Sequence, residues 1–128
     1  AHKIPYAATA SIAYPEDFIK KLRKARDIKG PKFFHVYAPC PTGWRLPPEK
    51  TVEISRMATD ACVFPLYEVE NGVIKINRKP AKKVSFIDYM TPQGRFRHLP
   101  ASVVEEIQRG IDREWEILLK RETFTQGL

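Results

Sequence analysis

The order of elements in the N-terminal part limits the fold more than any other feature of this sequence. Residues 4–12 (IPYAATASI) are typical of a buried strand. A helical pattern runs from Pro15 to the Gly30-Pro31 pair, and residues 33–38 (FFHVYA) form a second strand-like run. A strand, a helix and a strand in that order predict a βαβ unit with parallel strands and a right-handed crossover. The sequence therefore predicts an α/β fold.

The burial of these elements follows from their patterns. One face of the predicted helix is apolar, and the opposite face carries Lys20, Lys21 and Lys24. We expect the apolar face to pack on the sheet through Phe18, Ile19, Leu22 and Ala25. The second strand has no polar alternation beyond His35, so we expect it to be buried on both sides.

The middle of the chain predicts a helix and a hairpin. Residues 49–61 read as a helix whose apolar stripe contains Val52, Met57, Ala58 and Ala61. Asn71-Gly72 separates two alternating runs, 64–70 and 73–77, which predicts a hairpin with a type I′ turn. The expected pairs are Val69 with Ile74, Tyr67 with Ile76 and Glu68 with Lys75.

The last part predicts a basic loop and a long helix. Residues 78–83 (RKPAKK) form the loop, and residues 86–90 a short helix. Ser102 and Glu105 have the spacing of a capping box, so we expect the long helix to begin there and to end near Lys120, with a frayed tail. Its helical stripe, which we expect in a core or at a subunit contact, consists of Val104, Ile107, Ile111, Trp115 and Leu118.

Charge leaves several kinds of partner open. The net charge is +7, and the basic residues gather in segments 1–47 and 73–98. Such segments suit nucleic acid, an acidic protein or an anionic cofactor. Residues 94–99 (GRFRHL) place Arg95, Phe96, Arg97 and His98 together, either to stack on bases and clamp phosphate or as a basic surface loop with Phe96 packed beneath it. A small nucleic-acid-binding module is therefore a rival interpretation.

Other features bear on location. No run of about 18 apolar residues is present, so we expect no membrane partner. The N-terminus has no apolar signal-peptide core and no Met, and it opens almost at once on a strand, so we expect a piece of a longer, cytoplasmic protein. Two cysteines make no disulfide framework, so we expect both thiols to be free unless a metal holds them.

Cys40 lies in APCPTGW (38–44), just beyond the C-terminal end of a predicted parallel strand, where open α/β sheets bind ligands. Three roles remain open: a small buried residue, a nucleophile or a ligand. A nucleophile needs a base, and His35 points to the opposite face of the strand. One cysteine cannot hold a metal alone, so a ligand role needs partners from elsewhere. Cys62 is expected to pack in the core.

Two runs carry a resemblance to a known family: YAPCPTGWRLPPEKT and, after a helix, VFPLYEVENG. They resemble the C-terminal part of the beta subunits of the 2-oxoacid:ferredoxin oxidoreductases. Within that family, pyruvate:ferredoxin oxidoreductase (pyruvate synthase) is the first candidate. The resemblance covers nearly the whole chain, including AATASIAYPEDFIKKLRKARDIKGPKFFHVY and the late GRFRHL. The enzymes acting on branched-chain 2-oxoacids look similar here, so they are the alternative within the class.

The resemblance implies a thiamin diphosphate-binding α/β fold with a [4Fe–4S] cluster, in which Cys40 is the fourth cluster ligand. The other three cysteines and the motif for thiamin diphosphate and magnesium lie upstream in the family. Residues 1–62 then belong to the cofactor-binding domain, and 63–128 form an extension of the same compact unit. Cys62 stands where the family suggests a small residue such as glycine. Pro39 and Pro41 stiffen the loop, and the N–H groups of Thr42 and Gly43 are expected to point at cluster sulfur.

The expected activity of the complete enzyme is oxidative decarboxylation of pyruvate to acetyl-CoA, with coenzyme A as cosubstrate and electrons passed to ferredoxin. The expected partners are ferredoxin and the other subunits, of alpha, gamma and delta type. The basic loop and the long helix are expected to contact those subunits. This chain alone is expected to be inactive, because it holds one cluster ligand and no thiamin or magnesium site.

Overall fold

A computed structural model describes residues 3–128 and has the predicted α/β character. Eleven elements follow one another along the chain: β1 (Tyr6–Ser11), α1 (Pro15–Asp27), β2 (Lys32–Tyr37), α2 (Pro41–Trp44), the 3-10 turn η1 (Pro48–Lys50), α3 (Thr51–Asp60), β3 (Tyr67–Glu70), β4 (Val73–Ile76), α4 (Phe86–Met90), the 3-10 turn η2 (Gly94–Phe96) and α5 (Ala101–Gln126). The long C-terminal helix is therefore present.

The four strands form one mixed sheet in the order β2-β1-β3-β4. β1 and β2 are parallel and joined through α1, which confirms the predicted βαβ unit. β3 pairs antiparallel with both β1 and β4, and the hairpin register is the predicted one. Asn71 and Gly72 have φ values of 49° and 83°, as a type I′ turn requires at both central positions. The division of the chain at residue 62 stays a prediction.

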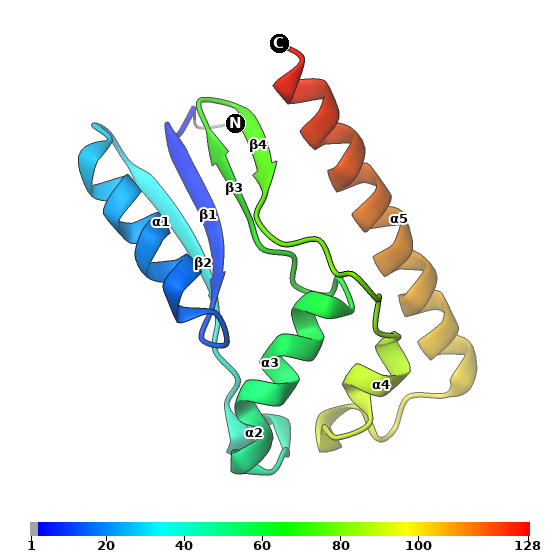
Figure 1. Ribbon diagram of the computed structural model, residues 1–128. Helices are drawn as coiled ribbons and strands as arrows, with labels where there is room; N and C mark the ends of the chain where they lie inside the picture. Colours follow the sequence, from blue (N-terminus) through cyan, green and yellow to red (C-terminus); the bar gives the residue numbers. More distant parts are fainter. Residues whose placement is uncertain (1–2) are drawn as a thin grey trace.

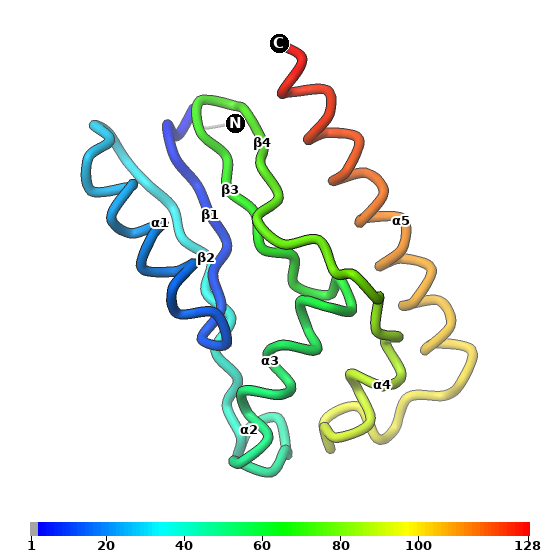
Figure 2. The backbone as a smooth tube through the Cα atoms, viewed as in Figure 1, coloured from blue at the N-terminus to red at the C-terminus, as the bar shows by residue number. Residues whose placement is uncertain are grey.

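The helices gather around the sheet in two places. α1 lies along β1 and β2, and α5 lies along β4 on the other side of the molecule (Figure 1). α2, α3 and α4 all lie beyond one end of the sheet. The backbone runs from β2 into α2 and α3, returns to the hairpin, descends to α4 and rises again as α5 (Figure 2). Residues that follow β2 therefore meet residues that follow β4.

Two apolar cores result from this arrangement. A small core lies between α1 and the sheet and contains Tyr6, Ala8 and Ala25, with Phe34 packed against them. A larger core lies beyond the end of the sheet and contains Tyr37, Leu46, Ile54, Ala58, Ala61, Phe86 and Tyr89. The larger core holds the segment after β2 against α3 and α4.

The buried face of helix α1 matches the prediction only in part: Ala25 is buried and Phe18 packs on Phe34, as predicted. Ile19 and Leu22 are 48% and 45% exposed, whereas Lys21, which was placed on the polar face, is only 2% exposed. The Lys21 ammonium donates to the backbone oxygen of Thr9 at 2.9 Å and to Asp17 Oδ2 at 2.7 Å. The prediction for Lys21 was wrong because these two partners satisfy the buried charge.

Strand β2 is not buried on both sides, so that prediction was also wrong. β2 pairs only with β1 among the strands of residues 3–128 and forms one edge of the sheet. Phe33 is 57% exposed, Val36 is 37% exposed and His35 is exposed. An apolar run marks a strand suited to a buried position, but its place in the order of strands decides its burial.

Two further helix predictions need correction. α3 begins at Thr51, after η1, and it buries Ile54, Ala58 and the following Ala61, while Val52 of the predicted stripe is exposed. α5 begins at Ala101 with Pro100 as N-cap and no side-chain cap, so the capping box at Ser102 is wrong. Since Ser102 already lies within the first turn, its side chain is not at the N-cap position.

The C-terminal turn of α5 is ordered, contrary to the frayed tail that was predicted. Its side chains bond to the backbone of β4: Ile76 N–H donates to Glu122 Oε1 at 2.7 Å, and Ile74 N–H donates to Thr125 Oγ1 at 3.0 Å. Gln126 Nε2 donates to Ile74 O at 3.2 Å. These bonds to β4 stabilise the last turn of the helix as far as Gln126. None of the helices within the described residues has the length and apolarity needed to cross a bilayer.

Candidate cysteine turn beyond the parallel strands

Cys40 opens a short turn beyond the C-terminal end of β2, which we call the cysteine turn (residues 40–45). Cys40 is the N-cap of α2, and its sulfur is exposed. The Gly43 N–H donates to Cys40 Sγ at 3.4 Å, and the Trp44 N–H donates to Cys40 O at 2.9 Å. The structure thus gives Cys40 a defined orientation with an accessible sulfur, and it excludes the role of buried core residue.

The cysteine turn is fixed at its other end by backbone geometry. Pro41 occupies the first helical position, and Arg45 ends the turn in the left-handed region at φ 55°. Leu46 N–H donates to Pro41 O at 3.1 Å, and the Leu46 side chain is buried in the larger core. The turn is therefore anchored, as its prolines suggested.

A pair of tyrosines supports the turn from below. The Tyr37 ring meets the Trp44 ring edge-on, with centroids 5.5 Å apart. The Tyr37 and Tyr89 hydroxyls share a hydrogen bond of 2.6 Å. Burial, with the bond to Tyr89, raises the pKa of Tyr37 well above its usual range, so Tyr37 stays neutral. This bond ties β2 to α4 directly beneath the turn.

The GRFRHL segment packs against the same turn. The Arg95 guanidinium lies 3.7 Å from the Trp44 ring centroid, and Gly94 N–H donates to Arg45 O at 2.8 Å. Phe96 packs on Phe86 and Tyr89, which is the arrangement expected of a basic surface loop with Phe96 beneath it. Arg95 therefore has an intramolecular aromatic partner.

Much of the basic loop is also neutralised within the chain. Arg78 lies 3.7 Å from Asp60, Lys79 lies 2.7 Å from Glu122, and Lys83 forms an ion pair with Asp112. Lys83 holds the pKa of Asp112 below its usual value. Three cations of the basic loop are therefore paired within the chain. The nucleic-acid interpretation rests on the net charge and on residues 95–98, and it stays a prediction.

The remaining candidate residues lie apart from the cysteine turn. His35 packs on the Phe64 ring, with centroids 5.0 Å apart. Cys62 is buried, as predicted, and burial raises the pKa of its thiol. Its φ of 58° lies in the region that favours glycine, in agreement with the small residue expected there. Both cysteines are free thiols.

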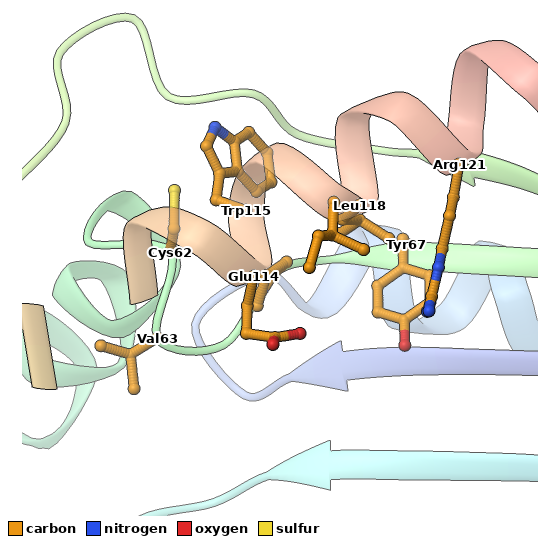
Figure 3. A pocket seen from close by; sticks show the side chains of 9 residues that line it. Cys62, Val63, Tyr67, Glu114, Trp115, Leu118 and Arg121 are labelled. Atoms are coloured by element: carbon orange, nitrogen blue, oxygen red, sulfur yellow. The ribbon is translucent and has the colours of Figure 1, made fainter. Parts of the chain in front are cut away.

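A cavity of about 220 Å³ lies between α5 and the segment that leads into β3 (Figure 3). Cys62, Val63 and Tyr67 line it from below, and Trp115 and Leu118 of α5 line it from above. Glu114 and Arg121 stand at its rim. The C-terminal end of the predicted α5 stripe therefore faces a cavity, whereas Val104, Ile107 and Ile111 nearer its start pack on the larger core.

Metal ligands are not clustered in this part of the protein. Within residues 3–128, no three His, Cys, Asp or Glu side chains are grouped closely enough to hold an ion. Cys40 is thus a single exposed thiol on an anchored turn. Sequence reasoning did not find the roles of Tyr37 and Tyr89, because their hydrogen bond joins segments 52 positions apart in the chain.

Comparisons with known proteins place the chain in a class. It is 52% identical to the pyruvate synthase subunit PorB of Methanocaldococcus jannaschii over 118 residues, 92% of this chain and 40% of the relative. It is also 52% identical to the ketoisovalerate oxidoreductase subunit VorB of Pyrococcus furiosus over 122 residues, 94% of this chain and 39% of the relative. The PorB of Thermotoga maritima is 44% identical over 98% of this chain and 40% of the relative. No family model matches the chain.

These similarities identify a class of oxidoreductase subunit. Over most of its length the chain is homologous to PorB and VorB subunits, which confirms the resemblance seen in its motifs. It corresponds to the C-terminal part of those subunits and spans about two fifths of the length of the curated relatives it matches.

Proposed function

We propose that this chain is the C-terminal part of the beta subunit of a thiamin diphosphate- and iron–sulfur-dependent 2-oxoacid:ferredoxin oxidoreductase, with pyruvate as the first candidate substrate. The observation that carries the proposal is the anchored cysteine turn, whose exposed Cys40 sulfur accepts a hydrogen bond from Gly43. Relatives named pyruvate synthase subunit PorB, similar over most of this chain, support the same assignment.

The residues present fit one corner of a [4Fe–4S] cluster. Such a cluster is held by thiolates, and its potential depends on hydrogen bonds to sulfur and on exposure to solvent. Cys40 supplies an accessible sulfur on a rigid backbone, and Gly43 supplies one N–H donor to that sulfur. Within residues 3–128 no three His, Cys, Asp or Glu side chains are grouped to hold an ion, so the proposal assigns the other cluster ligands to the part of the protein outside these residues.

The chemistry divides between the cofactors and this chain. When bound, thiamin diphosphate and magnesium activate the 2-oxoacid, and the iron–sulfur cluster takes up its electrons one at a time for ferredoxin. This chain holds the Cys40 sulfur in one orientation. The larger core beneath the turn limits water access from that side through Tyr37, Leu46 and Tyr89. Coenzyme A, ferredoxin and the alpha-, gamma- and delta-type subunits complete the proposed assembly.

A second candidate substrate has support of its own. VorB subunits of ketoisovalerate oxidoreductases are 51–52% identical to the chain, the same level as the PorB of M. jannaschii. A branched-chain 2-oxoacid is therefore the alternative to pyruvate. Ferredoxin reduction by the complete enzyme, measured with pyruvate and with ketoisovalerate at equal concentrations, decides between the two substrates.

The test of the cluster ligand uses the full-length subunit in its complex. Cys40→Ser is expected to lose iron and acid-labile sulfide and the electron paramagnetic resonance signal of the reduced cluster. Cys62→Gly is the matched control, because it removes the buried thiol at a position whose backbone suits glycine. If Cys40→Ser keeps its iron content, its sulfide content and its resonance signal, Cys40 is not a cluster ligand and the proposal is wrong.

A further inference from the structure

The turn at residues 93–96, which we call the arginine turn, packs against the cysteine turn but has no part in the proposed function. We propose that Arg95 is a positioning residue for Cys40: it clamps Trp44 and sets a fixed positive charge beside the cysteine turn. The inference rests on the proposed function for its effect on electron transfer, whereas the clamp itself is a property of this chain.

The first step is the contact between Arg95 and the two aromatic rings. Its guanidinium carbon lies 3.7 Å from the Trp44 ring centroid and 4.4 Å from the Phe96 ring centroid. A guanidinium at this distance over an indole face makes a cation–π contact, for which tryptophan is the best partner. The positive charge is thus carried on the ring that closes the cysteine turn.

The second step is that Arg95 is itself immobilised. Its Nε donates to Gln93 Oε1 at 2.9 Å, and an Nη donates to the Tyr89 hydroxyl at 3.2 Å. Gln93 is 1% exposed and donates in turn to Tyr89 O at 2.8 Å. Since buried groups fix two of its donors, the guanidinium cannot leave the indole without breaking this network.

The third step leads from Trp44 to Cys40. The indole is held between Arg95 on its face and Tyr37 at its edge, and the Trp44 N–H donates to Cys40 O. Gly94 fixes the next residue, because its N–H donates to Arg45 O. A Cβ at Gly94 would stand 2.6 Å from Arg45 Cβ, so only glycine permits the two turns to approach this closely.

The functional consequence concerns charge. A reduced iron–sulfur centre is more negative than its oxidised form, so a fixed cation nearby favours reduction and raises the reduction potential. Arg95 is half-buried, which limits screening of its charge by solvent. Arg95 therefore holds the ligand turn in place and favours electron uptake at it.

The experiment uses the full-length oxidoreductase complex with three variants. Arg95→Met removes the charge and keeps a long side chain, whereas Arg95→Lys keeps the charge and loses the planar stack. Arg97→Met is the matched control, because it removes the same charge from an exposed position two residues away. The measurements are hydrogen exchange of the peptide spanning residues 40–46 and the midpoint potential from a redox titration followed by electron paramagnetic resonance.

Arg95→Met is expected to lower the midpoint potential and to speed exchange of the Trp44 and Leu46 amides. A clamp of about 1 kcal/mol corresponds to about five-fold faster exchange. Arg95→Lys is expected to speed exchange of the same amides, but to lower the midpoint potential much less than Arg95→Met does. Arg97→Met is expected to match the unmodified protein in both measurements.

The inference is overturned if Arg95→Met and Arg97→Met behave alike in both measurements. Hydrogen exchange separates this failure from that of the proposed function, because it tests the clamp even where Cys40→Ser retains the cluster. Should Arg95→Met fail to assemble, Arg95→Lys decides: faster exchange in residues 40–46 supports the clamp, and unchanged exchange overturns it.

Discussion

The two edges of the sheet differ in whether the backbone of the edge strand is hydrogen-bonded on its outer side. At β4, side chains of α5 bond to the strand: Glu122 and Thr125 accept from Ile76 and Ile74, and Gln126 donates to Ile74 O. At β2, the outer edge carries exposed Phe33 and Val36 and meets no other strand among residues 3–128. Apolar strand edges of this kind are templates for further pairing. Within the part of the chain that the structure describes, the sheet is therefore closed at the β4 edge and open at the β2 edge.

The largest expected difference between the edges comes from deleting one apolar side chain at each. Ile76→Ala at the closed edge removes a side chain that is 7% exposed, so we expect a loss of about 2 to 4 kcal/mol in the free energy of unfolding. Val36→Ala at the open edge should cost less than about 1 kcal/mol, because Val36 is already partly in solvent. Urea unfolding followed by circular dichroism measures both. Equal losses would show that the β2 edge is covered in solution.

A smaller effect is expected from the carboxylate that closes the β4 edge. Glu122→Ala leaves the Ile76 N–H and Lys79 without their partner, which should cost about 1 to 3 kcal/mol. Glu116→Ala, an exposed position on the same helix, is the control and should change stability by less than about 0.5 kcal/mol. The same urea titration applies. If the two variants unfold alike, α5 does not close the edge through Glu122.

The smallest effect is a dependence on pH at the same contact. Burial of Glu122 alone would raise its pKa, but Lys79 and the Ile76 N–H outweigh burial and lower the pKa below its ordinary value of 4.5. A lowered folded-state pKa stabilises the fold above pH 4.5, and this stability is lost as the pH falls through the folded value. Hydrogen exchange of Ile74 and Ile76, corrected for the intrinsic pH dependence, should therefore lose protection below about pH 4.5. Glu122→Gln should remove this dependence; a retained dependence would assign it to another group.

Local rules predicted the parts of the fold that depend on neighbouring residues. Asn71-Gly72 gave the hairpin with its register, because a type I′ turn fixes which residues face one another. The βαβ unit followed from the change in periodicity over residues 4–38. The end of α5 was missed because it depends on β4, some 50 residues earlier in the chain, and not on helix propensity.

Burial was the least predictable property. The apolar run of β2 gave no sign that it would lie at an edge, because the order of strands is set by pairing between distant segments. Lys21 was placed in solvent because its charge suggested it, yet Asp17 and the Thr9 carbonyl satisfy it within the fold. Periodicity thus located the elements of the chain better than it located their solvent-facing sides.

For the candidate site, the sequence indicated Cys40 but not its supports. The prolines and the position after a parallel strand marked the turn, and the family resemblance supplied the proposed role. Arg95 drew attention as a basic residue, although its aromatic partner Trp44 lies 51 positions away by residue number. A contact of that kind becomes visible only once η2 and the cysteine turn are brought to the same end of the sheet.

The attachment of α5 to β4 has a consequence for assembly between molecules. Molecules polymerise through their β-strands only if each has two free strand edges, because each molecule must pair with one neighbour at each edge. Here a helix occupies one of those edges by side-chain bonds that a strand cannot use. Two copies of residues 3–128 that met through β2 in antiparallel register would pair about a two-fold axis and leave neither β2 edge free, so pairing of these residues would end at a dimer.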